Sequence, residues 1–363
     1  MKALVTADVC GGVLTWAAEL VTQLADHGVE VELVTFGGRA SAAQRARIEA
    51  SGPADWHESE LALEWMADPW SDLAQAADEL RALERGGQHD VVHLSGFGHA
   101  AAGFRAPVIV TAHSDVWSWW QAVHGSDPPR TWDRYRTWVR AGLRQAEAVI
   151  TPTAAMLPDL RQNYGTWPGR TVVIPNAVAS QGADSYVESS REPVALAAGR
   201  MWDPAKNGTV LARAAARLPR GTVRVAGDLR GAPDLSPAVC LGELTPAQLA
   251  AERRRAAVFA APARYEPFGL AVLEAALDGC ALVLGDIPSL RELWDEAAWF
   301  VDPADETELA TAIDTLISDT AAAHRWGRRA WERARELGGP LAFGRAHCRL
   351  YEELARVSSV AER

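Results

Sequence analysis

The chain alternates short apolar segments with amphipathic helical segments, and this alternation occurs in two successive series. In the first series, the apolar segment 2–8 is followed by a helical pattern over 13–28 and by a second apolar segment over 29–38. A strand, a helix and a strand in this order make a βαβ unit, whose strands are parallel and whose helix covers a face of the sheet. The pattern therefore predicts an α/β fold with candidate sites at the carboxyl ends of the strands.

A polar and irregular segment, 179–193, separates the two series and is the predicted linker. A chain of 363 residues is also longer than one hydrophobic core usually serves. We therefore expect an N-terminal Rossmann-like domain over 1–178 and a C-terminal one over 179–340, followed by a final helix over 341–363.

Composition narrows the class of ligand. The net charge of −11 counts against nucleic acid or an anionic membrane surface as the main partner, because both require basic surfaces. No apolar run approaches the roughly 20 residues that span a bilayer, and the start of the chain lacks the pattern of a secretory signal, so we expect a cytoplasmic protein without stable membrane insertion. The four cysteines form no CxxC pair, which argues against a disulfide framework and a zinc site. A small soluble ligand is expected instead.

The first apolar segment runs into the glycine turn Gly11-Gly12 and then into a helix. The dinucleotide fingerprint G-x-G-x-x-G is missing, and the second strand ends at Phe36-Gly37 without an acidic residue for a ribose. A nicotinamide cofactor is therefore not expected, and no other cofactor is indicated. The free N–H groups at the helix start suit a phosphate, although a tight turn selected only for its backbone geometry would have the same sequence.

The segment EPFGLAVLE places Glu266 and Glu274 on either side of a Pro-Phe-Gly-Leu step. A helix that begins near Pro267 would present the N–H groups of residues 268–270 to an anion, and it would separate the two carboxylates by about 12 Å along its axis. One carboxylate could then accept hydrogen bonds from a sugar and the other from a nucleoside ribose. The alternative is a solvated helix face that carries two unrelated glutamates.

The segment AAGRMWDPAKNG supplies positive charge at the carboxyl end of a predicted strand. Arg200 follows the strand directly, and Lys206 is one of only two lysines in the chain. Two cations at this position could neutralise a diphosphate and stabilise it as a leaving group without a metal ion. The alternative is a pair of surface cations in a loop.

Taken together, these motifs resemble those of the family 4 glycosyltransferases of the GT-B fold. The resemblance also rests on VTAHSD, VITPT, VIPNAV, LGELTPAQL and IPSLRELWDEAAWFVDP, and it extends over nearly the whole chain. It implies two Rossmann-like domains that face each other across a cleft, a last helix that crosses back to the N-terminal domain, and retaining, metal-independent transfer from a nucleotide-sugar donor. Two departures exist: Ala177 replaces the glycine usual after Pro-Asn, and Lys206 comes one residue later than in the commonest spacing.

The resemblance also implies roles for individual residues. His113, at the end of the segment PVIVTAH, is expected beside the reacting carbon. The implied catalytic residues are His113, Glu266, Arg200 and Lys206. The implied donor-binding residues are Gly12, Arg200, Lys206, Glu266, Phe268, Gly269, Leu270 and Glu274.

A tryptophan-rich segment follows His113, and Trp117, Trp119 and Trp120 are the candidate acceptor-binding residues. Aromatic faces can stack on a sugar or a planar acceptor, whereas tryptophans at such spacing also pack helices onto a sheet, and we expect both uses. No basic amphipathic patch accompanies them, which favours a small soluble acceptor. The pairs His89/His93 and His57/Glu60 have only a superficial metal-site spacing, because residues four apart on a strand lie far from each other, and no metal is assigned.

Three other activities remain open on the sequence. Another GT-B activity, such as a sugar-nucleotide epimerase or a phosphorylase, is possible, although a pyridoxal-phosphate phosphorylase is disfavoured because no lysine follows Lys206. The third alternative, besides an epimerase and a phosphorylase, is a protein that binds a nucleotide sugar without turnover.

Overall fold

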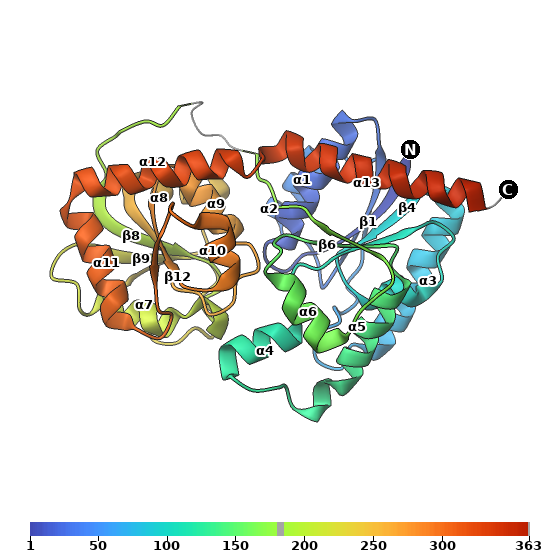
Figure 1. The fold of residues 1–363 in the computed structure, drawn as a ribbon, viewed down its shortest axis with the longest axis horizontal. Coiled ribbons are helices and arrows are strands. Elements are labelled where there is room, and N and C mark those ends of the chain that lie inside the picture. The colour runs from blue at the N-terminus through green and yellow to red at the C-terminus, as the bar shows by residue number, and fades with distance from the viewer. Residues whose placement is uncertain (180–184, 362–363) are drawn as a thin grey trace. The chain divides into compact units, whose positions relative to one another are not determined.

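The computed structural model describes residues 1–179 and 185–361, which form two compact units (Figure 1). Unit 1 comprises Met1–Gln121, Ser126–Val178 and Pro340–Arg363, and unit 2 comprises Ala122–Gly125 and Ala179–Gly339. Residues 180–184 of the predicted linker lie outside the described residues. Each unit is an α/β structure around one parallel sheet, so the predicted fold class is confirmed.

The sheet of unit 1 has the strand order β3-β2-β1-β4-β5-β6-β7, and every neighbouring pair is parallel. Its strands are β1 (Lys2–Asp8), β2 (Glu30–Phe36), β3 (Asp55–Glu58), β4 (Val91–Leu94), β5 (Val108–Thr111), β6 (Ala148–Thr151) and β7 (Arg170–Val173). The chain builds outward from β1 to β3 and then returns to place β4 beside β1. The direction of the strand order therefore reverses between β1 and β4. Sheets of this type bind ligands at the carboxyl ends of the two strands at such a reversal.

Helices cover both faces of this sheet (Figure 1). They are α1 (Val13–Asp26), α2 (Ala42–Ser51), α3 (Trp70–Gly87), α4 (Val116–His124), α5 (Asp133–Gln145), α6 (Met156–Tyr164) and α13 (Gly339–Ala361), with short 3₁₀ turns at Gly98–Ala102 and Arg130–Trp132. Side chains alternate along a strand, so Val5 and Leu4 of β1 enter different cores. The core on the Val5 side includes Trp16 of α1 and Tyr351 of α13, which therefore cover the same face.

The sheet of unit 2 has the order β10-β9-β8-β11-β12-β13 and is also parallel. Its strands are β8 (Glu192–Ala198), β9 (Thr222–Ala226), β10 (Val239–Gly242), β11 (Ala256–Ala261), β12 (Ala281–Gly285) and β13 (Trp299–Val301). Its helices are α7 (Gly208–Ala215), α8 (Pro246–Arg255), α9 (Leu270–Leu277), α10 (Pro288–Trp294), α11 (Glu306–Ser318) and α12 (Thr320–Glu336), with a 3₁₀ turn at Pro204–Lys206. The strand order reverses between β8 and β11, so the carboxyl ends of these two strands mark the position expected for a ligand.

Candidate active site

Lys206 and Glu266 form an ion pair at the carboxyl edge of the unit 2 sheet. Lys206 ends the 3₁₀ turn that follows β8, and Asp203 caps this turn by accepting a hydrogen bond from the backbone N–H of Ala205 at 2.9 Å. The N–H of Arg264 donates to the carbonyl of Ala205 at 2.9 Å, which holds the segment after β11 against the turn. Two charged groups that are far apart in the sequence are thereby brought into one small pocket.

Arg200 lies just after β8, as the sequence predicts, but its partners are its own neighbours. Its guanidinium carbon lies 5.3 Å from the ring centroid of Trp202, and its Nη2 lies 3.7 Å from Oδ2 of Asp203. The Arg200 side chain is 37% exposed, whereas that of Lys206 is 24% exposed. Arg200 is therefore the more accessible of the two cations for an anionic ligand.

The turn between β11 and α9 differs from the sequence prediction. The helix begins at Leu270 and not near Pro267, because Gly269 adopts a left-handed conformation with φ of 87° and acts as the N-cap. Glu266 thus precedes the helix, and the separation of about 12 Å inferred from helical rise does not apply to the pair. A Cβ atom on Gly269 would lie 3.3 Å from Cγ of Glu266, so glycine permits the close approach of the Glu266 side chain. Phe268 is buried and anchors the turn.

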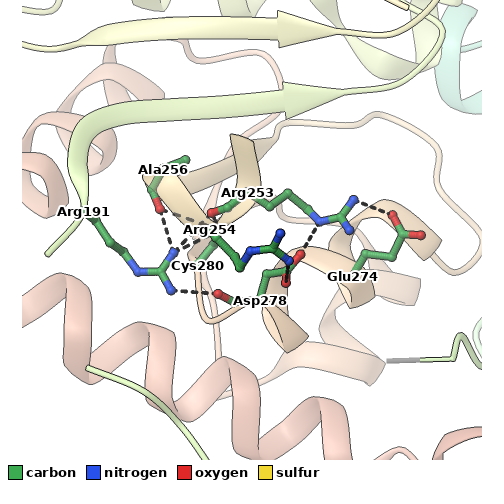
Figure 2. Close-up of polar contacts among 7 residues, drawn as sticks. All are labelled: Arg191, Arg253, Arg254, Ala256, Glu274, Asp278 and Cys280. Carbon is green, nitrogen blue, oxygen red and sulfur yellow. Dashed lines mark hydrogen bonds and ion pairs between the residues drawn. The ribbon is translucent and has the colours of Figure 1, made fainter. Parts of the chain in front are cut away.

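Glu274 lies on α9 and is part of an ion-pair network that the sequence motifs did not predict (Figure 2). Its Oε2 accepts a hydrogen bond from Nη1 of Arg253 at 2.8 Å, and Nε of Arg253 donates to Oδ2 of Asp278 at 2.7 Å. Arg253 is only 8% exposed. The only signal in the sequence was the run of three arginines at the end of α8, and it does not show which of them pairs with an acidic residue.

In unit 1, the glycine turn lies at the carboxyl end of β1, next to β4. Gly11 has a φ of 76°, and Gly12 is the N-cap of α1 without a side-chain capping bond. Both glycines are exposed. The first N–H groups of α1, which have no acceptor within the helix, therefore lie next to an exposed turn at the position where the strand order reverses.

His113 follows β5 and packs against the indole of Trp16, with ring centroids 4.4 Å apart in an edge-on arrangement. The residue is partly buried, and its Nε2 is buried without a hydrogen-bond partner among the described residues. Burial, with a smaller contribution from His347, lowers the pKa of His113 to about 3. The imidazole is therefore neutral at physiological pH and carries no positive charge.

His93, His347 and Tyr351 lie beneath Trp16 and form with it and His113 a buried group that we call the histidine cluster. Nδ1 of His93 and the Tyr351 hydroxyl are 2.6 Å apart, and Nε2 of His93 lies 2.6 Å from Oγ1 of Thr111. The His93 and His347 rings stack at 5.7 Å. The cluster joins α13, near the end of the chain, to the strand that carries His113, and no local sequence pattern indicated it.

The three candidate acceptor tryptophans occupy different environments. Trp117 is 3% exposed and lies in a core of unit 1, with the Arg136 guanidinium 4.8 Å from its ring centroid. It has no surface for an acceptor in this structure, because its indole packs the start of α4 onto the unit. Trp119 and Trp120 are partly exposed and lie edge-on to each other at 6.1 Å.

Near the amino ends of the unit 1 strands, Glu32, Asp55 and His57 bring possible metal ligands within 4.8 Å of one another. Glu32 already accepts a hydrogen bond at 2.9 Å from Nζ of Lys2, and its other partners are His57 at 2.9 Å and His89 at 3.0 Å. A carboxylate that is paired with an ammonium group and two imidazoles has its charge compensated within the protein. We interpret the group as structural and assign no metal to it. None of the helices in the described ranges has the length and hydropathy that a bilayer span requires.

Comparison with known proteins places these features in a family. The family model described as Glycosyltransferase Family 4 matches residues 10–181, and the model described as Glycosyl transferases group 1 matches residues 192–319. The D-inositol 3-phosphate glycosyltransferase of Corynebacterium efficiens is 27% identical over 385 aligned residues, which cover 90% of this chain and 87% of that protein. Glycogen synthase of Mycobacterium tuberculosis is 28% identical over 211 residues, which cover 53% of this chain and 50% of that protein.

Solved structures show the same fold. Sucrose-phosphate synthase from Thermosynechococcus elongatus superposes with a TM-score of 0.77 at 18% identity and covers 98% of this chain and 100% of that one. Anabaena Alr3699/HepE, solved in complex with UDP and glucose, gives a TM-score of 0.73 at 18% identity and covers 98% of this chain and 100% of that one. With the two matched family models and the two parallel α/β units, these findings show that the chain belongs to glycosyltransferase family 4 and has the GT-B fold.

Proposed function

We propose that this glycosyltransferase moves a hexose-type sugar from a nucleotide-sugar donor to a small soluble acceptor, with retention of the anomeric configuration and without a catalytic metal. The observation that carries the proposal is the Lys206–Glu266 ion pair beside the Gly269 turn, at the carboxyl edge of the unit 2 sheet. The names of the relatives support it, and so does Anabaena Alr3699/HepE, whose structures were solved with UDP and glucose and with UDP-glucose.

The ion pair suggests how a donor would enter. Before binding, the Lys206 ammonium and the Glu266 carboxylate compensate each other. A diphosphate would offer Lys206 a second anionic partner, and Lys206 and the more exposed Arg200 would then share the phosphate oxygens. Glu266 would become available to accept hydrogen bonds from sugar hydroxyls. In this proposal the exchange of partners couples recognition of the phosphate to recognition of the sugar.

The remaining donor contacts follow from position. The N–H groups of Phe268, Gly269 and Leu270 precede or open α9, where the helix dipole favours negative charge. Glu274, one turn further along α9, is proposed to accept the ribose hydroxyls. Gly12 of unit 1 is proposed to contact the phosphate or the sugar through the start of α1.

Retention follows from the groups proposed for the site. In the proposed step the bond from the anomeric carbon to the diphosphate oxygen breaks, the acceptor oxygen attacks from the same face, and the acceptor proton passes to the departing phosphate. Such a step relies on positioning and on charge stabilisation by Arg200 and Lys206. A histidine whose pKa is about 3 is a weak base at neutral pH, so His113 is proposed to hold a sugar hydroxyl and not to deprotonate an acceptor.

A panel of α-linked UDP-, ADP- and GDP-sugars tests the proposal. Purified protein is incubated with each donor and a set of polyols, sugars and sugar phosphates, and release of the nucleoside diphosphate is measured together with the product. Proton NMR of the anomeric coupling should show an α-glycoside. A β-glycoside would contradict retention, a free epimerised nucleotide sugar would favour an epimerase, and donor binding without any turnover would favour a binding protein.

A further inference from the structure

Arg253 links the proposed ribose ligand to the framework of unit 2. It lies near the end of α8, and its guanidinium reaches two acidic side chains: Nη1 donates to Oε2 of Glu274 at 2.8 Å, and Nε donates to Oδ2 of Asp278 at 2.7 Å (Figure 2). Glu274 lies on α9, and Asp278, four residues later, is the C-cap residue of that helix. One guanidinium thus bridges two acidic side chains, those of Glu274 and Asp278.

The two ends of the Arg253 contact differ in exposure. The Asp278 side chain is 9% exposed, and the Glu274 side chain is 28% exposed. A buried guanidinium needs a compensating charge and fixed hydrogen bonds, and Asp278 supplies both from the interior. The ion pair with Asp278 therefore fixes the position of the Arg253 guanidinium, and this guanidinium in turn holds the more exposed Glu274 carboxylate.

A second arginine holds the backbones that carry this anchor. Nη2 of Arg191 donates to the carbonyl of Asp278 at 2.7 Å, and its Nη1 donates to the carbonyls of Ala256 at 2.9 Å and Arg253 at 3.2 Å (Figure 2). The end of α8 and the end of α9 are thus tied to one guanidinium. These backbone hydrogen bonds fix the position of Arg253 relative to Asp278. The hydrogen bond from Arg253 therefore holds one oxygen of the Glu274 carboxylate in a fixed place.

We propose that Arg253 is a positioning residue, which holds the Glu274 carboxylate in the orientation that accepts the ribose hydroxyls and so strengthens discrimination for a ribonucleotide. The proposal rests on the proposed function, in which Glu274 binds the ribose. A carboxylate has about four acceptor sites, and the Arg253 bond occupies one of them. A glutamate free to rotate would lose side-chain entropy when it binds a diol, whereas a glutamate already held by Arg253 loses less.

The test compares each nucleoside diphosphate with its 2′,3′-dideoxy form, which keeps the base and both phosphates but lacks the hydroxyls. Dissociation constants are measured by calorimetry for UDP, ADP and GDP and their dideoxy analogues, and the pair that binds the wild-type protein most tightly is used thereafter. The wild-type protein should bind the ribo form about tenfold or more tightly than the dideoxy form, because a carboxylate is a strong acceptor. Glu274→Gln should reduce this ratio towards one.

Arg253→Gln is the decisive variant. We expect it to reduce the ratio by about threefold or more while the affinity for the dideoxy form changes by less than about twofold, because only the hydroxyl contact depends on Glu274. The double variant Arg253→Gln/Glu274→Gln should show the same ratio as Glu274→Gln alone. The matched control is Arg254→Gln, which removes the neighbouring guanidinium and its ion pair with the same Asp278 and should keep the wild-type ratio.

Two results would overturn the proposal. One is an unchanged ratio in Arg253→Gln when Glu274→Gln reduces it, and the other is an equal loss of affinity for the ribo and dideoxy forms, which is the pattern of a merely structural arginine. If Arg253→Gln does not fold, Asp278→Asn is measured in its place, because it weakens the Arg253–Asp278 ion pair but leaves Arg253 present. This variant should lower the ribo-to-dideoxy affinity ratio, by less than the reduction expected for Arg253→Gln. Failure of the wild-type protein to bind any of the diphosphates would instead refute the proposed function itself.

Discussion

The histidine cluster should make unit 1 sensitive to mild acid. His347 is fully buried on α13, where its Nδ1 lies 2.9 Å from the carbonyl of Phe343 and its ring faces His93 and Trp16. Its Nε2 has no hydrogen-bond partner among the described residues. A proton added there would place a positive charge in an apolar environment without an acceptor, and burial accordingly lowers the pKa of His347 to about 4.

The direction and size of the effect follow from proton linkage. An unfolded chain protonates this histidine with a pKa near 6.5, whereas the folded protein protonates it near 4. Because the folded pKa is the lower one, the stabilising contribution is fully present above pH 6.5 and is lost as the pH falls from 6.5 towards 4. At pH 5, about 1.5 pH units below the unfolded pKa, His347 alone should cost about 2 kcal/mol of unfolding free energy relative to pH 7.

The assay compares the wild-type protein with His347→Asn at pH 7 and pH 5. Asparagine does not titrate, and its amide can still donate to the Phe343 carbonyl. Equilibrium urea denaturation is monitored by a pulse of hydrogen exchange under one fixed labelling condition. Peptides from β4 and β5 then report the unfolding of unit 1 separately from that of unit 2. The loss of unfolding free energy between pH 7 and pH 5 should be about 2 kcal/mol smaller in the variant. The matched control is His124→Asn, which removes an exposed imidazole outside the cluster and should keep the wild-type loss.

One result would refute this reasoning. If His347→Asn lost as much unfolding free energy between pH 7 and pH 5 as the wild-type protein, protonation of His347 would not be the source of acid sensitivity. A lower stability of the variant at both pH values would not matter, because a smaller side chain in a packed core is destabilising at any pH.

Four further predictions concern the candidate site. Lys206→Ala should weaken nucleoside diphosphate binding by about tenfold or more, since it removes a charge-assisted hydrogen bond, whereas Arg230→Ala, which removes an exposed cation of the same unit, should have little effect in the same calorimetric titration. Gly269→Ala should lower unfolding free energy by about 1–3 kcal/mol because of its left-handed backbone and should also weaken donor binding, whereas Gly242→Ala, also left-handed but in open space, should affect stability alone. Trp119→Ala should raise the KM for the acceptor several-fold without changing that for the donor, and an equal change in both would contradict its assignment. Turnover should survive exhaustive removal of divalent metals, and its abolition by a chelator would refute the metal-free step.

The sequence by itself determined the α/β class and the positions of the candidate residues along the chain. Apolar segments alternating with amphipathic helices indicate parallel strands, because a parallel neighbour requires a crossover connection, which is usually a helix, and one hand of crossover strongly predominates. Once the strands are parallel, Arg200 after β8, Glu266 after β11 and His113 after β5 must lie at carboxyl edges. Such local patterns repeat along the chain, so they are readable without any knowledge of tertiary contacts.

The conformation of the turn before α9 was within reach of the sequence but was predicted wrongly. Proline is favoured in the first turn of a helix, which suggested a start near Pro267. Gly269 instead takes a left-handed conformation that other residues avoid, and the helix starts after it. The preference of Pro267 for the first turn of a helix competed with the ability of Gly269 to adopt a left-handed conformation. The observed turn has the glycine conformation, and the side chain of Phe268 is buried in it.

Only the tertiary structure decided which side chains meet. The Lys206–Glu266 pair, the Arg253–Glu274 contact and the stacking of His93 on His347 each join residues from different elements. Their meeting depends on strand register and on how each helix is rotated about its axis against the sheet. The sequence gives the period of a helix but not which of three successive arginines at the end of α8 turns inward. Burial then decides the chemistry, because it is the loss of water around His113 and His347 that lowers their pKa values.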